Sequence, residues 1–160
     1  MITYKEYFEK IKNEIFEKIK EEEESERIIL LIQNEITVFF IAERIKDKIE
    51  PKENEIIFTY NLFKYKYKNM KFEDARNIIK QNILSRKIPM FQKDEILYIL
   101  NKSNNIKLNK NEIKKSIKYN AFKEILLNKI IKNEIDKTNF FEKNLDKINK
   151  IKNTILNNII

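Results

Sequence analysis

The feature that most constrains the fold is a dense apolar segment, residues 25–49, in which large apolar side chains recur mostly at three- and four-residue spacing. The repeating positions are Ile28, Leu31, Ile32, Ile36, Phe39, Phe40 and Ile45. This spacing predicts an amphipathic helix with a wide buried face. Further apolar residues at Ile29, Leu30, Val38 and Ile41 indicate that the helix is covered on more than one side. Residues 28–32 and 37–41 also have the composition of β-strands, so a hairpin of two strands is the second interpretation.

Helix starts are marked by capping residues. Three sites pair a capping side chain with a glutamate three residues later, as in a capping box: Thr3 with Glu6, Asn109 with Glu112, and Asn139 with Glu142. Ser25 is a further candidate N-cap, although a single helix running through Ile49 is the alternative. The chain has no glycine, so helices cannot end in the usual glycine C-cap and are expected to end in Asn or Lys.

Helical stripes follow one another along the chain. The first begins at Tyr4, another begins at Ile56, and a third begins at Phe72 and stops before Pro89. A fourth covers residues 93–101. The last two begin at Asn109, with a break near Tyr119 and Asn120, and at Asn139, from where the stripe continues to the end. The weakest assignment is residues 56–67, where alternating side chains also fit a short β-hairpin. We therefore predict an all-α fold, a single domain over residues 1–160, built as a bundle of six or seven helices.

Missing residue types exclude much chemistry. The chain has no glycine, histidine, cysteine or tryptophan. Without glycine there is no phosphate-cradling loop and no nucleophile elbow. Without histidine and cysteine the commonest general base, the commonest metal ligand and every thiolate are absent. We therefore expect no cofactor, no metal and no enzymatic activity.

One loop resembles the twelve-residue calcium loop of an EF-hand in its spacing. Its positions are Asn101, Ser103, Asn105, Asn109 and Glu112. Ile106 stands where that loop needs glycine for its sharp turn, and Glu112 is the only carboxylate. The end of one helix followed by the N-cap of the next explains the same residues, so this loop does not change the expectation of no metal.

Positive charge lies in the last two thirds of the chain. Residues 1–50 carry 9 basic and 13 acidic side chains (net −4), residues 51–110 carry 13 and 6 (net +7), and residues 111–160 carry 11 and 6 (net +5). A basic surface attracts polyanions. Ile, Lys and Asn together make up 81 of 160 residues, and all three have A/T-rich codons. Codon usage thus competes with function as the cause of the lysine excess.

The most suggestive basic patch alternates lysine with tyrosine. It comprises Lys64, Tyr65, Lys66 and Lys68, followed by Lys71 and Arg76, and is extended by Arg86 and Lys87. Interleaved cations and rings can follow a phosphate backbone while the rings stack on bases. The competing interpretation places Phe63 and Tyr67 in the core and leaves the lysines as a solvated face.

A second, weaker candidate is a helix-turn-helix. It would comprise residues 109–118, a turn at Tyr119 and Asn120, and residues 121–132. The second helix would present Lys123, Asn128, Lys129 and Lys132. Its turn lacks glycine, and Glu124 falls where a buried residue is expected.

We expect a binding protein without catalytic activity. The first hypothesis is contact with nucleic acid or a ribonucleoprotein complex through a basic surface after residue 51. The alternative is a protein-protein inhibitor or adaptor of phage or mobile-element type, whose lysines reflect codon usage. The first ten residues show no signal-peptide pattern, and residues 28–42 are too short and too polar to span a membrane. We therefore expect a cytoplasmic protein with no membrane contact.

Overall fold

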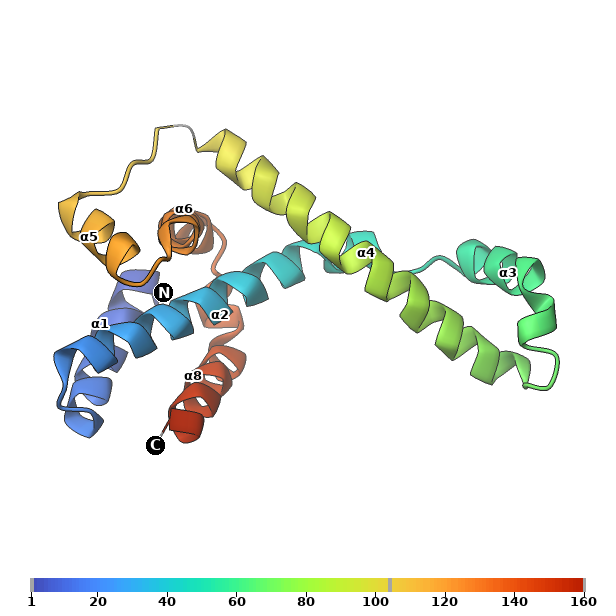
Figure 1. Ribbon diagram of the computed structural model, residues 1–160, viewed down its shortest axis with the longest axis horizontal. Coiled ribbons are helices and arrows are strands. Elements are labelled where there is room, and N and C mark those ends of the chain that lie inside the picture. Colours follow the sequence, from blue (N-terminus) through green and yellow to red (C-terminus); the bar gives the residue numbers. More distant parts are fainter. Residues whose placement is uncertain (1, 104, 160) are drawn as a thin grey trace. The chain divides into compact units, whose positions relative to one another are not determined.

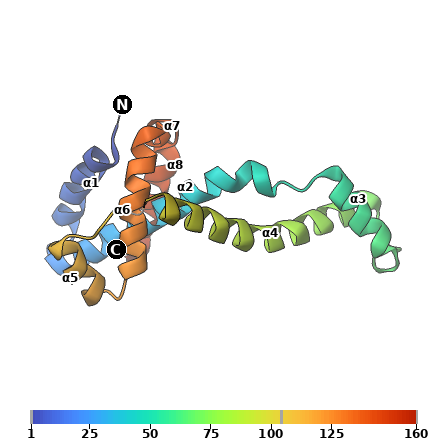
Figure 2. The ribbon, with the colours of Figure 1, turned by 90° about the horizontal axis from the view of Figure 1, so that it is seen from above.

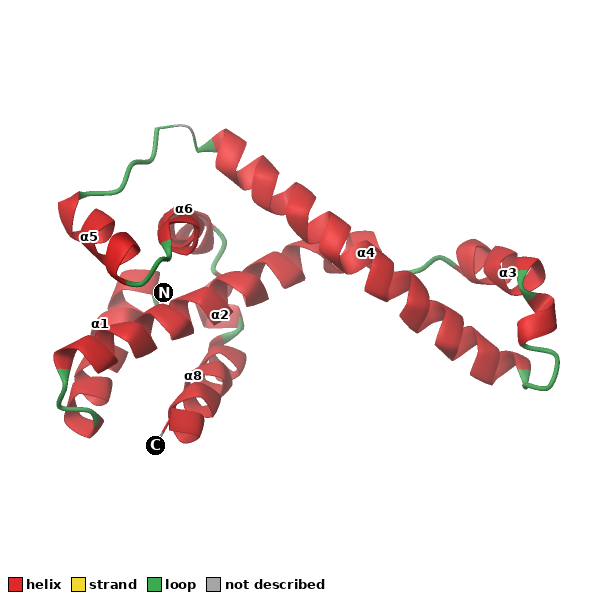
Figure 3. Cartoon of the chain, viewed as in Figure 1, coloured by secondary structure: helices red, strands yellow, loops and turns green. Residues whose placement is uncertain are grey.

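The computed structural model of the chain describes residues 2–103 and 105–159. Over these residues it has eight α-helices, one short 3-10 helix and no strand, which confirms the all-α prediction (Figure 3). The helices are α1 Tyr4–Lys18, α2 Glu22–Ile49, α3 Glu53–Leu62, η1 Lys64–Lys66, α4 Phe72–Lys102, α5 Lys110–Lys118, α6 Phe122–Lys137, α7 Phe140–Lys143 and α8 Leu145–Ile159. Residues 56–67 form α3 and η1, so neither hairpin alternative is present in the described chain.

The chain divides into two compact units (Figure 1). Unit 1 comprises Met1–Phe40 and Ile99–Ile160, and unit 2 comprises Ile41–Tyr98. Each unit has its own buried apolar residues. Whether the two units make one domain is not decided by this division, so the single domain stays a prediction.

Unit 1 packs the apolar stripes of its helices against one another. In α1 the buried residues are Tyr4, Tyr7, Phe8, Ile11 and Ile15, and in α2 the fully buried ones are Ile28, Ile32 and Ile36. Phe141 of α7 is also fully buried and contacts the rings of Tyr4 and Tyr7, with centroids 5.6 and 5.0 Å away. Residues 25–40 of the predicted apolar segment are thus part of the core of unit 1, in which α1, the first part of α2, α6 and α8 are gathered together (Figure 2). Residues 41–49 of the segment belong to unit 2.

Two of the predicted helix caps are present. The Thr3 hydroxyl accepts a hydrogen bond from the Glu6 backbone N–H at 3.1 Å. Asn109 and Glu112 form a reciprocal capping box, each side chain accepting from the other's backbone N–H at 2.9 Å. Because both signals depend on local contacts only, the sequence was sufficient to find them. The predicted break near Tyr119 and Asn120 is also present: α5 ends at Lys118, α6 begins at Phe122, and Asn120 between them has a positive φ of 48°.

Of two other predicted helix starts, the one at Ser25 was wrong and the one at Asn139 was correct only in part. Ser25 is not an N-cap: α2 begins at Glu22, and the Ser25 hydroxyl donates to the carbonyls of Ile19 and Glu21 at 3.0 and 2.9 Å. Asn139 does precede a helix, but it adopts a left-handed conformation (φ 59°) and its side chain makes no capping bond. The helix after it is also interrupted at Asn144, whose amide donates to the Phe140 carbonyl at 3.0 Å.

Unit 2 is a helical hairpin with a small core of its own. Helix α3 lies beside the first turns of α4, and the two are joined through η1 (Figures 1 and 2). Its core contains Ile56, Tyr67, Ala75, Ile79 and Ile83, with Tyr60 packed against them. Ion pairs surround this core, including Lys80 with Glu50 at 2.9 Å.

The prediction that a helix ends before Pro89 was wrong. Helix α4 continues through Pro89 to Lys102. Proline has no N–H to donate to the carbonyl four residues earlier, and its ring crowds that carbonyl, so it usually ends a helix. Here the helix is held on both sides of Pro89: Ile83 is buried before it, and beyond it the buried Glu95 carboxylate lies 3.1 Å from Arg44 and 3.7 Å from Lys48. Tertiary contacts therefore outweigh the local cost.

Over the described residues, none of the helices combines the length and the apolar content that crossing a membrane requires.

Candidate nucleic-acid interface

The basic patch predicted from the sequence lies at one end of unit 2. We call residues 62–72 the tip: they comprise the last residue of α3, η1, the turn that follows it and the first residue of α4. Backbone hydrogen bonds give the tip a defined course, from the Lys66 N–H to the Phe63 carbonyl (2.9 Å) and from the Tyr67 N–H to the Lys64 carbonyl (3.1 Å). The tip is therefore a folded turn whose backbone conformation is defined by hydrogen bonds.

Tyr67 anchors the tip in the core of unit 2. Its side chain is only 8% exposed and stacks on Tyr60 with the ring centroids 6.1 Å apart. Phe72 meets Tyr60 edge-on at 5.1 Å. These contacts hold the middle of the tip and its last residue against Tyr60 of α3.

Tyr65, in contrast, is exposed. Its side chain is 71% exposed, and it has no ring partner among the described residues. The contrast between Tyr65 and Tyr67 is the one expected from the sequence. An exposed ring of this kind offers a flat face on which a planar ligand can stack.

The lysines of the tip are free of carboxylates. Lys64, Lys66, Lys68 and Lys71 are all exposed, and within the described chain none of them forms an ion pair. The Lys66 ammonium lies 5.6 Å from the centroid of the Phe63 ring, which orients it by a cation–π contact. No acidic residue occurs between Glu55 and Glu73. The tip consequently carries four exposed lysines, without ion-pair partners among the described residues, in the same short segment as an exposed ring.

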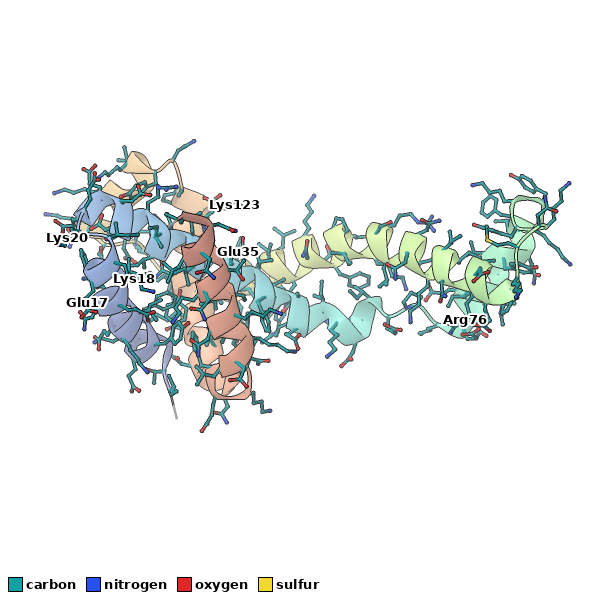
Figure 4. The ribbon with its side chains drawn as sticks, turned by 90° about the horizontal axis from the view of Figure 1, so that it is seen from below. Glu17, Lys18, Lys20, Glu35, Arg76 and Lys123 are labelled. Carbon is teal, nitrogen blue, oxygen red and sulfur yellow. The ribbon has the colours of Figure 1, made fainter. Side chains whose placement is uncertain are left out.

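Arg76 and Lys87, which the sequence placed in the same patch, are compensated. Arg76 lies on α4 (Figure 4) and donates to Glu53 at 2.7 Å, while Lys87 donates to Glu55 at 2.9 Å. Hydrogen bonds from Arg76 and Lys87 lower the pKa of Glu53 and Glu55 respectively, and the bond to Glu53 raises the pKa of Arg76. Both cations join α3 to α4 and are less available to a ligand than the lysines of the tip.

Arg86 differs from these two. It is exposed and forms no ion pair with any described residue. It lines a groove between α3 and α4 whose other lining residues include Phe58, Thr59 and Met90. The predicted patch is therefore split by the structure into free cations (Lys64, Lys66, Lys68, Lys71 and Arg86) and paired ones (Arg76 and Lys87).

Sequence reasoning missed the apolar part of this surface. Phe58 and Leu62 lie one helical turn apart on α3 and are 67% and 59% exposed. Phe63, which the sequence placed in the core, is half-exposed because the helix ends at Leu62 and the stripe does not continue through it. The signal that could have found them is the run of seventeen residues, 56–72, that combines apolar side chains with lysines and contains no carboxylate.

The helix-turn-helix alternative loses two of its proposed contacts. Asn128 is buried, where its side chain accepts from Thr37 and donates to Asn34, both at 2.7 Å. Lys129 donates to Glu112 and to the Lys107 carbonyl, both at 2.7 Å. These two side chains hold unit 1 together and do not face a ligand. Of the other two, Lys123 is exposed on α6 (Figure 4).

Residues 2–103 and 105–159 contain no group of three or more acidic side chains placed to hold a metal ion. Glu112, the one carboxylate of the calcium-like loop, is engaged by Lys129 and the Asn109 N–H.

Comparison of the chain with protein-family models, with curated proteins and with solved structures returned no match.

Proposed function

We propose that the protein binds nucleic acid, alone or within a ribonucleoprotein, through the tip of unit 2. The observation that supports this most strongly is the set of four lysines, without carboxylate partners in the described chain, in the same short segment as the exposed Tyr65 ring. Unpaired cations neutralise phosphates and release counterions, whereas cations already paired with carboxylates contribute little. The proposal therefore describes a helical binding protein without catalytic activity. It also places the protein in the cytoplasm.

The proposal is tested by the salt dependence of binding. A protein that contacts four phosphates on a single strand should show a slope of log affinity against log salt of about −3. Fluorescence anisotropy with labelled RNA and DNA between low and physiological salt measures this slope directly. Binding that is strong but independent of salt, or no binding at low salt, contradicts the proposal.

A charge-neutral variant tests whether the paired cations take part. Changing Glu53 and Arg76 together to Gln removes one ion pair and leaves the net charge of +8 unchanged. Because Arg76 is already compensated, we expect the slope against salt to stay within experimental error of the parent. A clear loss of affinity in this variant would instead place Arg76 on the phosphate backbone.

A second candidate function, docking to a protein partner, is favoured by a different surface. Ile117 on α5 is 77% exposed, and Ile113 and Phe122 beside it in sequence are also exposed. Nucleic-acid binding through the tip does not explain these apolar side chains, which are typical of protein contact sites. If the protein binds no nucleic acid at low salt, this function takes first place, and a pull-down from the host that Ile117→Lys abolishes becomes the deciding experiment.

A further inference from the structure

An exposed apolar row connects the tip with the groove between α3 and α4. Phe58 and Leu62 occupy one face of α3, a turn apart, and Tyr65 follows three residues later in η1. All three are more than half exposed. Large exposed side chains in such a row are costly in water unless a ligand covers them.

The groove at one end of the row has the size and lining of a small-ligand site. Its volume is about 600 Å³, within the range of roughly 300–1,000 Å³ for such sites. Phe58, Ile83 and Met90 supply apolar contact, Arg86 supplies a guanidinium without an ion pair among the described residues, and Asn54 supplies an amide with both a donor and an acceptor. The Glu55 carboxylate also lines the groove, but it is neutralised by Lys87 at 2.9 Å. The Thr59 hydroxyl is already used, since it donates to the Glu55 carbonyl at 2.8 Å.

We infer that this groove receives an unpaired nucleobase, stacked on Phe58, and that the ligand of the tip is therefore a single-stranded nucleic acid. The inference rests on the proposed function and names its substrate class. One base would stack on Phe58 and another on Tyr65, while the lysines of the tip and Arg86 follow the phosphates. Asn54, which lines the same groove, would supply the hydrogen bond to the edge of the base.

The chemistry of the row favours a single strand over the other occupants. A duplex keeps its bases stacked inside, so it cannot place one in a groove without losing base pairs. An apolar helix of a partner protein would cover the row, but it would not compensate the tip lysines and Arg86, which no described carboxylate neutralises. A phosphate-bearing chain with exposed planar rings satisfies both features at once.

The experiment uses the absence of tryptophan from the natural chain. Phe58→Trp creates a single indole at the groove, and stacking on a base quenches its emission. The matched control is Phe122→Trp, which places an indole at another exposed phenylalanine, on unit 1. Both proteins are titrated with oligouridine RNA, with single-stranded DNA and with a duplex of equal length, about 16 nucleotides. Circular dichroism checks that both variants keep the parent fold.

We expect strong quenching of the indole at position 58 by both single strands, and little by the duplex or in the Phe122→Trp control. Phe58→Ala should weaken single-strand binding by about 5- to 100-fold and leave duplex binding unchanged.

The inference is overturned if duplex and single strand bind equally and the indole at position 58 is not quenched. If that binding still depends on salt, the proposed function stands. Absence of binding to any nucleic acid overturns both. Emission at position 58 that shifts with protein concentration alone shows that a second copy covers the row, which also overturns the inference.

Discussion

Tyr67→Ala should lower the free energy of unfolding of unit 2 by about 3–5 kcal/mol, the usual cost of removing a buried aromatic ring. The ring is almost fully buried, stacks on Tyr60, and belongs to the small core formed with Ile56, Ala75 and Ile79. A core of this size has few other contacts to replace it. Urea unfolding followed by circular dichroism measures the loss, and hydrogen exchange of the α3 and α4 amides locates it in unit 2.

Two nearby substitutions provide the controls. Tyr65→Ala removes an equal ring two residues away, but that ring is exposed, so the change in stability should stay within about 0.5 kcal/mol. Tyr67→Phe keeps the ring and should retain most of the stability, because the packing of the ring and not its hydroxyl supports the core. Equal destabilisation by Tyr65→Ala and Tyr67→Ala would show that the tip is not anchored as described.

The pair Tyr65 and Tyr67 also shows what the sequence could predict. Their opposite burial was expected from the spacing of apolar residues, although for the wrong reason. The stripe was drawn as one continuous helix, whereas α3 ends at Leu62 and Tyr67 reaches the core from the turn beyond η1. Periodicity finds which residues have a buried partner more reliably than it finds where a helix ends.

Contacts distant in sequence account for what could not be predicted. Arg76 and Lys87 appeared to belong to the basic patch because their partners, Glu53 and Glu55, lie 23 and 32 residues away along the chain. Pro89 stays inside α4, with Glu95 beyond it paired to Arg44, 51 residues earlier. Capping boxes span only three residues, and so Asn109 with Glu112 was correctly predicted.

The second large effect is expected from reversing the charge of the tip. Changing Lys64, Lys66 and Lys68 together to Glu should reduce affinity for RNA and DNA on the order of 100-fold at low salt, and should reduce the slope of log affinity against log salt by about 2. All three side chains are exposed and unpaired in the described structure, so the substitutions leave no buried charge behind. If these lysines contact phosphates and not bases, as the proposed function requires, the loss should be nearly equal across nucleic-acid sequences.

The matched control separates a local site from overall charge. Lys114, Lys123 and Lys150 are exposed lysines of unit 1, and changing them to Glu also lowers the net charge from +8 to +2, a change of −2 at each of three positions. If only total charge matters, the two triple variants should lose affinity equally, and the lysine excess is then a general property of the surface. If the tip is the site, the unit 1 variant should keep most of its affinity and of its slope against salt. A tip variant that binds as the parent does would show that these lysines are a solvated face.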